Sequence, residues 1–315
     1  MIATVTLNPA VDKTLTTSMA ILGAVNRADS VVNVPGGKGI NVAKVLKTFG
    51  YDVKALGFLG GYTGQKIEEY ANEIGIKCCF THIKGESRTS INVVSADGYV
   101  TEFLEPGPAI SQEEIDAFLD NYRKEIEECD IVVLSGSTPV GIPSTFYADL
   151  ISIASKMDKK VLLDSSGDNL KKGMYARPFM IKPNMKELES LMGRRLQGMQ
   201  GVAIAATQIV EWGVPNVLVS MGKKGIVYAK EGEKAPEVYY VPAPSVKAVN
   251  TVGSGDSAVA AFAMAIEKGL SPEETVKKCV AVSVANVLSI ENGIISMASV
   301  HEIESKLQLA STFVS

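Results

Sequence analysis

The sequence predicts an α/β protein with three layers, in which a mostly parallel central sheet lies between helices and carries a small β-sheet lid. The first observation is that short apolar strand-like runs alternate with helical segments along almost all of the 315 residues. Such alternation is typical of a parallel sheet that is covered on both faces. The second observation is that two β-rich regions, about 10–35 and 88–105, contain no helix. We expect them to form a lid within a single domain of residues 1–315.

The N-terminal elements follow this alternation. The β-rich run "MIATVTLN" comes first, and the helical segment "GINVAKVLKTFG" follows the first lid region. The strand "DVKALGFLG" and the helix "TGQKIEEYANEIG" come next. In the second lid region, Asp97 and Gly98 join two β-rich runs, and this dipeptide is a strong signal for a hairpin. The first helix places four apolar residues on one face, at i, i+3, i+4 and i+7: Val42, Val45, Leu46 and Phe49.

The C-terminal elements continue the pattern. The predicted strands are "DIVVLSG", "KVLLDSS", "FMIKPN" and "NVLVSMG", with a helical stretch between each pair. The longest apolar runs, near 257–266 and 279–290, are too short to span a bilayer, so we expect buried helices there.

Composition and charge limit the classes of partner. Hydrophobic residues make up 46% of the chain and charged residues 21%, as in soluble globular proteins. A net charge of -4 argues against binding to nucleic acids or anionic membranes, but it allows a small phosphorylated ligand. The four cysteines form no CxxC pair, and we interpret the adjacent Cys78 and Cys79 as strand residues. With no signal peptide in the first residues, a reducing cytoplasm is the expected location.

The stretch "VNTVGSGDS", residues 249–257, places glycines and one acid at the start of a helix. A helix N-terminus offers unpaired N–H groups and partial positive charge, which suit a phosphate or a phosphoryl group in transfer. Gly253, Ser254 and Gly255 are therefore candidates for an anion hole. Because Asp256 would repel a phosphate, we interpret it as the base that takes a proton from an attacking hydroxyl, kept ionised by the helix dipole.

Two alternatives stay open for this motif. An Asp at a helix start can simply stabilise the first turn. Gly253, Gly255 and Ala258 also fit the dinucleotide pattern GxGxxA, but a lone match is weak, and no strand ending in an acid follows this helix. The pattern GxxxxGK[ST] does not occur, so the sequence does not indicate a P-loop enzyme.

Two further polar clusters are predicted at strand ends, where open α/β sheets bind ligands. In "VPGGKGINVAKVL", Lys38 lies among glycines and Asn41 lies in the first turn of a helix, and Asp12 in "TLNPAVDK" is expected nearby. These groups suit a sugar phosphate, although glycines before a helix are common. In "IKPNMKELESL", Lys182 suits nucleotide phosphates and Glu187 suits magnesium, or only caps a helix. Three cations are assigned to a substrate phosphate, although any one of them could equally be a solvated surface charge: Arg27, Lys38 and Arg88.

Taken together, these motifs resemble the ribokinase-like, or PfkB, family of carbohydrate kinases. "GGKGINVAK" and "NTVGSGDS" match the two signatures of the family, and "KPNMKE" and "LVSMGKKG" match its nucleotide side. The resemblance covers essentially the whole chain. "TVTLNPAVD" and "LSGSTPVG" are similar to the ketohexose-phosphate branch, which comprises tagatose-6-phosphate kinases and 1-phosphofructokinases.

The resemblance implies a ribokinase-like fold, a role for each candidate residue, and often a homodimer formed through the lid. Asp256 would be the base, with the anion hole at Gly253, Ser254 and Gly255. The sugar phosphate would meet Asp12, Gly37, Lys38, Asn41, Arg88 and Ser90, with Arg27 and Ser137 as further contacts. ATP would face Lys182, Asn184, Ser220, Gly222, Gly225 and Asn286, and Glu187 would organise Mg²⁺.

The expected reaction is the phosphorylation of a ketohexose monophosphate to a 1,6-bisphosphate, dependent on ATP and magnesium. Tagatose 6-phosphate is the favoured substrate, and fructose 1-phosphate is the alternative. Two other classes of protein are rival interpretations. A non-catalytic sugar-phosphate sensor needs no base, so it would not explain Asp256. A nucleoside kinase would leave Lys38 and Arg88 without a phosphate to bind.

Overall fold

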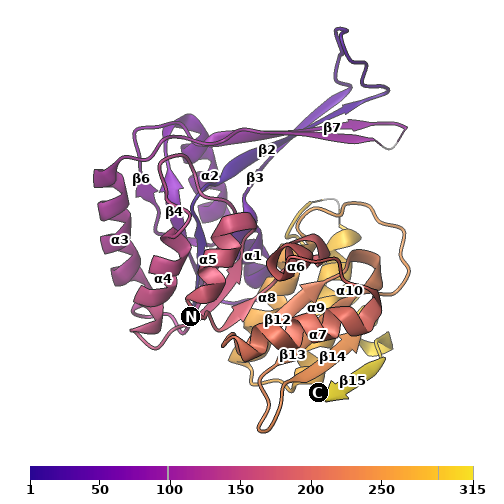
Figure 1. Cartoon of the computed structure of the whole chain (residues 1–315). Coiled ribbons are helices and arrows are strands. Elements are labelled where there is room, and N and C mark those ends of the chain that lie inside the picture. Colours follow the sequence, from indigo (N-terminus) through magenta and orange to yellow (C-terminus); the bar gives the residue numbers. More distant parts are fainter. Residues whose placement is uncertain (98, 290, 315) are drawn as a thin grey trace.

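The computed structural model describes residues 1–97, 99–289 and 291–314, and Figure 1 shows the course of the chain. Within these residues, one 11-stranded sheet has the order β15-β14-β13-β12-β11-β10-β9-β1-β4-β5, and β6 pairs with β4. In this order, each strand from β12 across to β5 is parallel to its neighbour. The four strands at the other edge, β15 to β12, are antiparallel to one another. The mostly parallel sheet is confirmed. Its strands are β1 (Ile2–Thr6), β4 (Val53–Leu59), β5 (Lys77–Cys78), β6 (Thr81–His82), β9 (Ile131–Ser135), β10 (Lys160–Asp164), β11 (Met180–Ile181), β12 (Asn216–Ser220), β13 (Ile226–Lys230), β14 (Glu237–Val241) and β15 (Ser311–Val314).

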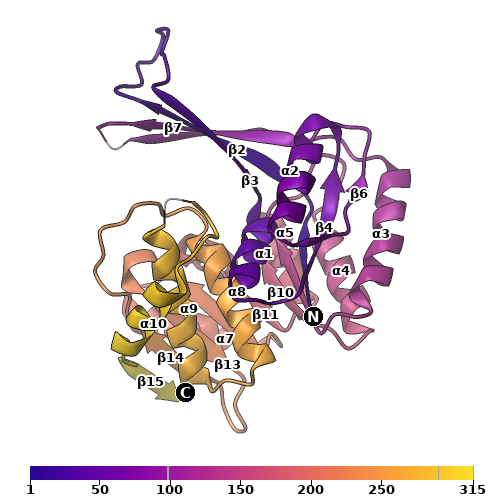
Figure 2. The same cartoon turned by 180° about the vertical axis from the view of Figure 1, so that it is seen from behind.

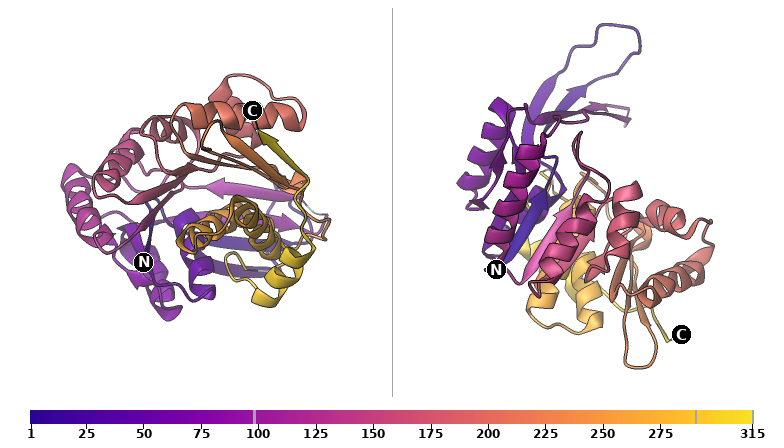
Figure 3. Two further views of the ribbon diagram at one scale, coloured as in Figure 1. Left: turned by 90° about the horizontal axis from the view of Figure 1, so that it is seen from below. Right: turned by 60° about the vertical axis from the view of Figure 1, so that its left-hand side comes forward.

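Helices cover both faces of this sheet, which confirms the three layers (Figure 3). Because side chains alternate along a strand, Ile131 and Val133 of β9 join one core, and Val132 and Leu134 join the other. The first core also contains α1 (Lys38–Thr48), α2 (Gly61–Glu73), α8 (Ser254–Glu267), α9 (Pro272–Val287) and α10 (Met297–Lys306). The second contains α3 (Gln112–Ile126), α4 (Phe146–Ser155), α5 (Gly167–Tyr175), α6 (Met185–Met192) and α7 (Gly198–Glu211).

A second, four-stranded sheet comes from the two β-rich regions. Its order is β3-β2-β7-β8, with β2 (Ala10–Thr17), β3 (Ser30–Gly36), β7 (Arg88–Ser95) and β8 (Val100–Leu104). β7 and β8 pair antiparallel as the predicted hairpin requires, and Gly98 itself lies outside the described residues. Figures 1 and 2 show this sheet projecting from the N-terminal half of the chain and overhanging the C-terminal half. We call it the lid.

The predicted helices form where their apolar spacing places them. α8 and α9 are the buried helices expected from the two long apolar runs, and residue 290 of the second run lies outside the described residues. Cys78 ends β5 and Cys79 follows it, so only the first is a strand residue. Within the described ranges, no helix is both long enough and apolar enough to cross a membrane.

Candidate active site

Three residues form the N-terminal mouth of α8. Gly253 precedes the helix with a φ of 78°, a conformation that favours glycine. Ser254 and Gly255 begin the helix, so their N–H groups have no acceptor within it. A Cβ at Gly255 would lie 3.1 Å from Nζ of Lys182, so glycine leaves this ammonium room to approach the mouth. N–H groups without an acceptor in their own helix and a cation therefore meet at the predicted anion hole.

Asp256 lies in the first turn of α8 and is 5% exposed. Asn41 of α1 donates its Nδ2 hydrogen to Oδ2 of Asp256 at 2.9 Å. Burial raises the pKa of Asp256, and the ammonium of Lys38 is the strongest influence against that rise. That the helix dipole keeps this acid ionised stays a prediction. A carboxylate with a raised pKa is a stronger base, which suits proton abstraction.

Asp164 holds the two lysines of the site in place. It ends β10, is fully buried, and lies 3.2 Å from Nζ of Lys38 and 3.2 Å from Nζ of Lys182. Burial alone would raise the pKa of Asp164, but the two lysines outweigh burial and keep the pKa below its ordinary value. Asp164 thus holds two ammonium groups beside the mouth of α8, where each of them can attract a phosphoryl group.

Glycine also allows the close approach of α1. Gly37 precedes α1 with a φ of 114°, and a Cβ there would lie 2.8 Å from the methyl group of Thr6. Glycine therefore suits both the backbone conformation and the space. The next residue, Lys38, begins the helix and reaches Asp164. Three of the candidate residues, Lys38, Asn41 and Asp256, thus lie close together.

Asp12 marks the lid side of the site. It lies on β2 opposite Ser90 of β7, and a Cβ at Gly36 would lie 2.4 Å from its Oδ2. Burial raises the pKa of Asp12 to about 6, and the charges of Lys44 and Arg88 are the largest influences against this rise. Asp12 can therefore change its protonation state near neutral pH.

A polar corner lies next to Asp12. Arg88 donates from Nε to the carbonyl of Asn8 at 3.2 Å and from Nη1 to the carbonyl of Glu105 at 3.0 Å. Asn8 donates from Nδ2 to the carbonyl of Pro106 at 3.0 Å and lies 3.5 Å from Oγ of Ser137. Among the described residues, Oδ1 of Asn8 is buried and has no hydrogen-bond partner. A buried acceptor without a partner is costly, so it is suited to a ligand hydroxyl.

Asn8 and Asp164 belong to the site, although the sequence motifs do not single them out. Both follow or end a buried strand, as Asn in "TVTLNPAVD" and Asp in "KVLLDSS", and this position was the available signal. Arg27 lies apart from the corner, on the exposed loop between β2 and β3, where its carbonyl accepts from the Thr17 hydroxyl. Its contact with the sugar phosphate stays a prediction.

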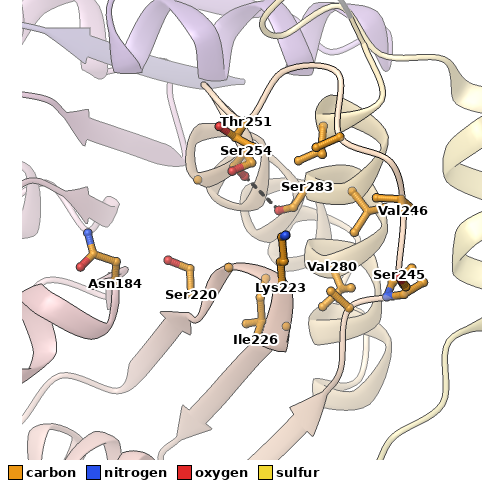
Figure 4. Close-up of a pocket in the computed structure, with 18 residues that line it drawn as sticks. Asn184, Ser220, Lys223, Ile226, Ser245, Val246, Thr251, Ser254, Val280 and Ser283 are labelled. Carbon is orange, nitrogen blue, oxygen red and sulfur yellow. Dashed lines mark hydrogen bonds between the residues drawn. The ribbon is translucent and has the colours of Figure 1, made fainter. Parts of the chain in front are cut away.

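A cavity of about 440 Å³ lies on the other side of the mouth of α8. Figure 4 shows Asn184 and Ser220 on one side of it and Val246 and Ser245 on the other. Lys223 points between them, toward Ser283 and Ser254. An apolar wall beside polar groups is typical of a pocket for a small molecule or cofactor. Predicted residues that line the cavity are Asn184, Ser220, Gly222, Ser254, Gly225 and Gly255, and the apolar wall includes Ile226, Ala243, Val246, Val280, Val284 and Val287.

Asn286 lies behind this mouth. It is buried on α9, donates from Nδ2 to the carbonyl of Val252 at 2.8 Å and accepts from the N–H of Gly293 at 2.9 Å. These bonds fix the chain that leads into Gly253. The contact of Asn286 with ATP stays a prediction.

Glu187 caps α6, as the alternative interpretation required. Its Oε2 accepts from the N–H of Asn184 at 2.8 Å, and Oδ1 of Asn184 accepts from the N–H of Glu187 at 3.0 Å. In the part of the chain that the structure describes, no three His, Cys, Asp or Glu side chains form a metal cluster. Mg²⁺ often uses one protein carboxylate together with water and substrate phosphates, so a single Glu187 fits such an ion.

The fold and this site together define a class, the α/β enzymes that move a phosphoryl group from a nucleotide to an alcohol. The sequence pattern of the pfkB family carbohydrate kinases matches residues 4–296. The chain therefore belongs to this family.

Relatives of known name match almost the whole chain. A tagatose-6-phosphate kinase of Staphylococcus epidermidis is 37% identical over 312 residues, which cover 98% of this chain and 99% of that protein. A 1-phosphofructokinase of Bacillus subtilis is 38% identical over 294 residues, covering 93% and 94%. The crystal structure of phosphofructokinase-2 from Escherichia coli with substrates and products has a TM-score of 0.90 and 31% identity, covering 96% and 98%.

Proposed function

We propose that this protein phosphorylates a ketohexose monophosphate to a 1,6-bisphosphate, with ATP as the donor. The main support is the position of Asp256, which is buried at a glycine-lined helix mouth between the polar lid side and the apolar cavity. A base at that point can contact an acceptor hydroxyl from one side while the γ-phosphate enters from the other.

In the proposed reaction, Asp256 takes the proton of the acceptor hydroxyl. The hydroxyl oxygen forms a bond to the γ-phosphorus, the bond from this phosphorus to the bridging oxygen breaks, and ADP leaves. The N–H groups of Ser254 and Gly255 and the ammonium groups of Lys38 and Lys182 would stabilise the negative charge of the moving phosphoryl group. Asp164 keeps both lysines in place for this role.

The sugar phosphate would lie under the lid. Arg88 is held by two backbone carbonyls, which orients the rest of its guanidinium for a phosphate. Asp12 and the buried acceptor Oδ1 of Asn8 would accept from sugar hydroxyls. Gly37, Asn41, Ser90 and Ser137 are proposed as neighbours of the same ligand, and Arg27 as a further cation from the lid loop.

ATP would occupy the 440 Å³ cavity, with its base against the valine wall and its phosphates toward Gly253. Asn184, Ser220, Gly222 and Gly225 line the proposed path of the ribose and phosphates. A magnesium ion held by these phosphates and by Glu187 through water would neutralise part of their charge.

We propose tagatose 6-phosphate as the substrate, with the C1 hydroxyl as acceptor. Fructose 1-phosphate, with its C6 hydroxyl, is the alternative, because relatives with both names match at similar identity. The test is kcat/KM for tagatose 6-phosphate, fructose 1-phosphate and fructose 6-phosphate, measured as ADP release. We expect one of the first two to exceed fructose 6-phosphate at least tenfold. Sugar binding without ADP release would indicate a sensor, and preference for a nucleoside would indicate the other rival class.

We also propose that two copies associate through the lid. Its strands expose a set of large apolar side chains, and such a patch is typical of a protein interface. A second copy of the chain is the partner that the family resemblance supports for this patch. We also propose a reducing cytoplasm as the location of the protein, in keeping with four free cysteines. Sedimentation should give a dimer that Phe103→Glu weakens. A monomeric wild type would contradict the proposal. The apolar residues are Val31, Val32, Val100, Phe103 and Leu104.

A further inference from the structure

Helix α1 contains a buried lysine that the proposed reaction does not use. Lys44 is only 1% exposed, so its ammonium must find partners inside the protein. Its Nζ donates to the carbonyl of Pro35 at 2.7 Å and lies 4.9 Å from the centre of the Tyr70 ring. Pro35 belongs to β3 and Tyr70 to α2. The lysine therefore ties α1 to the base of the lid and to α2.

The same side chain supports the loop that follows α9. A Cβ at Gly293 would lie 2.9 Å from Cβ of Lys44, so the loop backbone rests directly on the lysine stem. Gly293 has a φ of 79°, which also favours glycine. Glu291, two residues earlier in the loop, accepts a hydrogen bond from the hydroxyl of Tyr70. Residues 291–293 are thus held at Gly293 by the stem of Lys44 and at Glu291 by the hydroxyl of Tyr70.

This loop also contacts the mouth of α8. The N–H of Gly293 donates to Oδ1 of Asn286, whose Nδ2 donates to the carbonyl just before Gly253. A Cβ at Gly253 would lie 3.3 Å from Cβ of Asn292, so the loop also packs against the residue that begins the predicted anion hole. Contacts therefore run from the base of the lid, through the lysine and the loop, to the nucleotide side of the site.

Three carboxylates from different elements and the burial of the side chain together set the pKa of this lysine. Asp12 on β2, Asp256 on α8 and Glu291 on the loop all favour its protonated form, and the phenol of Tyr70 lies against it. Burial is the larger influence and lowers the pKa of Lys44 to about 8. Loss of its proton would leave these carboxylates without a shared cation.

We propose that Lys44 is a positioning residue that couples the sugar side of the site to the nucleotide side. It acts through Pro35 and Gly293: an ordered lid base and an ordered 291–293 loop share one ammonium and one stem, so order on either side favours order on the other. The inference rests on the proposed kinase function, because it assumes that both ligands bind.

The test compares three variants by calorimetric titration with ADP and Mg²⁺, with and without the sugar phosphate that the wild type accepts. Lys44→Met removes the charge and keeps a stem of similar length, and Lys44→Arg keeps the charge. Lys47→Met, one turn further along α1, is the matched control. We expect the sugar phosphate to tighten ADP binding at least about fivefold in the wild type and in Lys47→Met. In Lys44→Met this factor should fall below about twofold, and Lys44→Arg should restore at least half of it.

The pH dependence gives a readout that a merely structural role would not change. Wild-type kcat/KM should fall above about pH 8 as Lys44 loses its proton. Lys44→Arg should keep its activity to higher pH, since an arginine stays protonated. An alkaline limb that is the same in both proteins would overturn the inference.

The coupling measurements can also overturn the inference. No coupling in the wild type, or coupling in Lys44→Met within twofold of the wild type, would overturn the inference. If Lys44→Met fails to fold, Tyr70→Phe takes its place, because it releases Glu291; coupling should then fall at least twofold, and unchanged coupling would overturn the inference. A wild type that phosphorylates no ketohexose phosphate would refute the proposed function instead.

Discussion

Replacing Asp164 by asparagine should both destabilise the protein and slow the enzyme. The carboxylate is fully buried and lies 3.2 Å from each of two ammonium groups. Removal of one partner from a buried ion pair costs about 3–5 kcal/mol, because it leaves charge uncompensated. Lys38 keeps 41% of its side chain exposed, whereas Lys182 keeps 4%, so mainly Lys182 loses its compensation. We therefore expect the lower end, about 3 kcal/mol.

Urea unfolding followed by circular dichroism measures this loss, with the exposed Asp168→Asn as the matched control. The pKa of Asp164 is lowered in the folded state, so its contribution to stability is present above the unfolded pKa, near 4, and is lost as the pH falls through the folded pKa. The difference between wild type and Asp164→Asn should therefore be full at pH 7 and shrink below about pH 4. A loss below about 1 kcal/mol at pH 7 would refute the view that the two lysines depend on this carboxylate.

Three further changes test other parts of the site. Arg88→Ala should raise KM for the sugar phosphate at least tenfold and change KM for ATP less than twofold; equal effects on both would place Arg88 elsewhere. Gly255→Ala would put a Cβ 3.1 Å from Nζ of Lys182, so kcat/KM for ATP should fall about tenfold, whereas Gly201→Ala, with no atom nearer than 3.7 Å, should have little effect. The pKa of Asp12 is raised to about 6, so its contribution to the stability of the ligand-free protein is present below pH 4 and lost by pH 6. Asp12→Asn should therefore flatten the pH dependence of the unfolding free energy between these two pH values. An unchanged pH dependence would contradict the raised pKa.

The sequence was sufficient for features that depend on local spacing. Apolar periodicity predicted α1 and α2, and the Asp97-Gly98 dipeptide predicted the pairing of β7 with β8. The family resemblance also implied that Lys38, Asn41 and Asp256 belong to one site, and the hydrogen bond between Asn41 and Asp256 joins residues 215 positions apart.

Other features depend on which strands and helices become neighbours. In the sequence, Asp164 is an ordinary residue at the end of a strand. Its role depends on the pairing of β10 with β11, which brings Lys182 to the same edge of the sheet. Lys44 lies between Ala43 and Val45 on α1. From the sequence alone, a lysine at this position would be expected to face solvent. It is buried because the lid base, α2 and the loop after α9 all close over that face. No spacing rule contains that information.

The most direct test of the proposed catalytic mechanism is the turnover of Asp256→Asn. Asparagine keeps the shape of the side chain and a bond to Asn41, so ADP and sugar phosphate should bind within about threefold of the wild-type affinity. Without the base, kcat measured as ADP release should fall about a thousandfold. Turnover within tenfold of the wild type, with both ligands still bound, would mean that this carboxylate does not activate the hydroxyl.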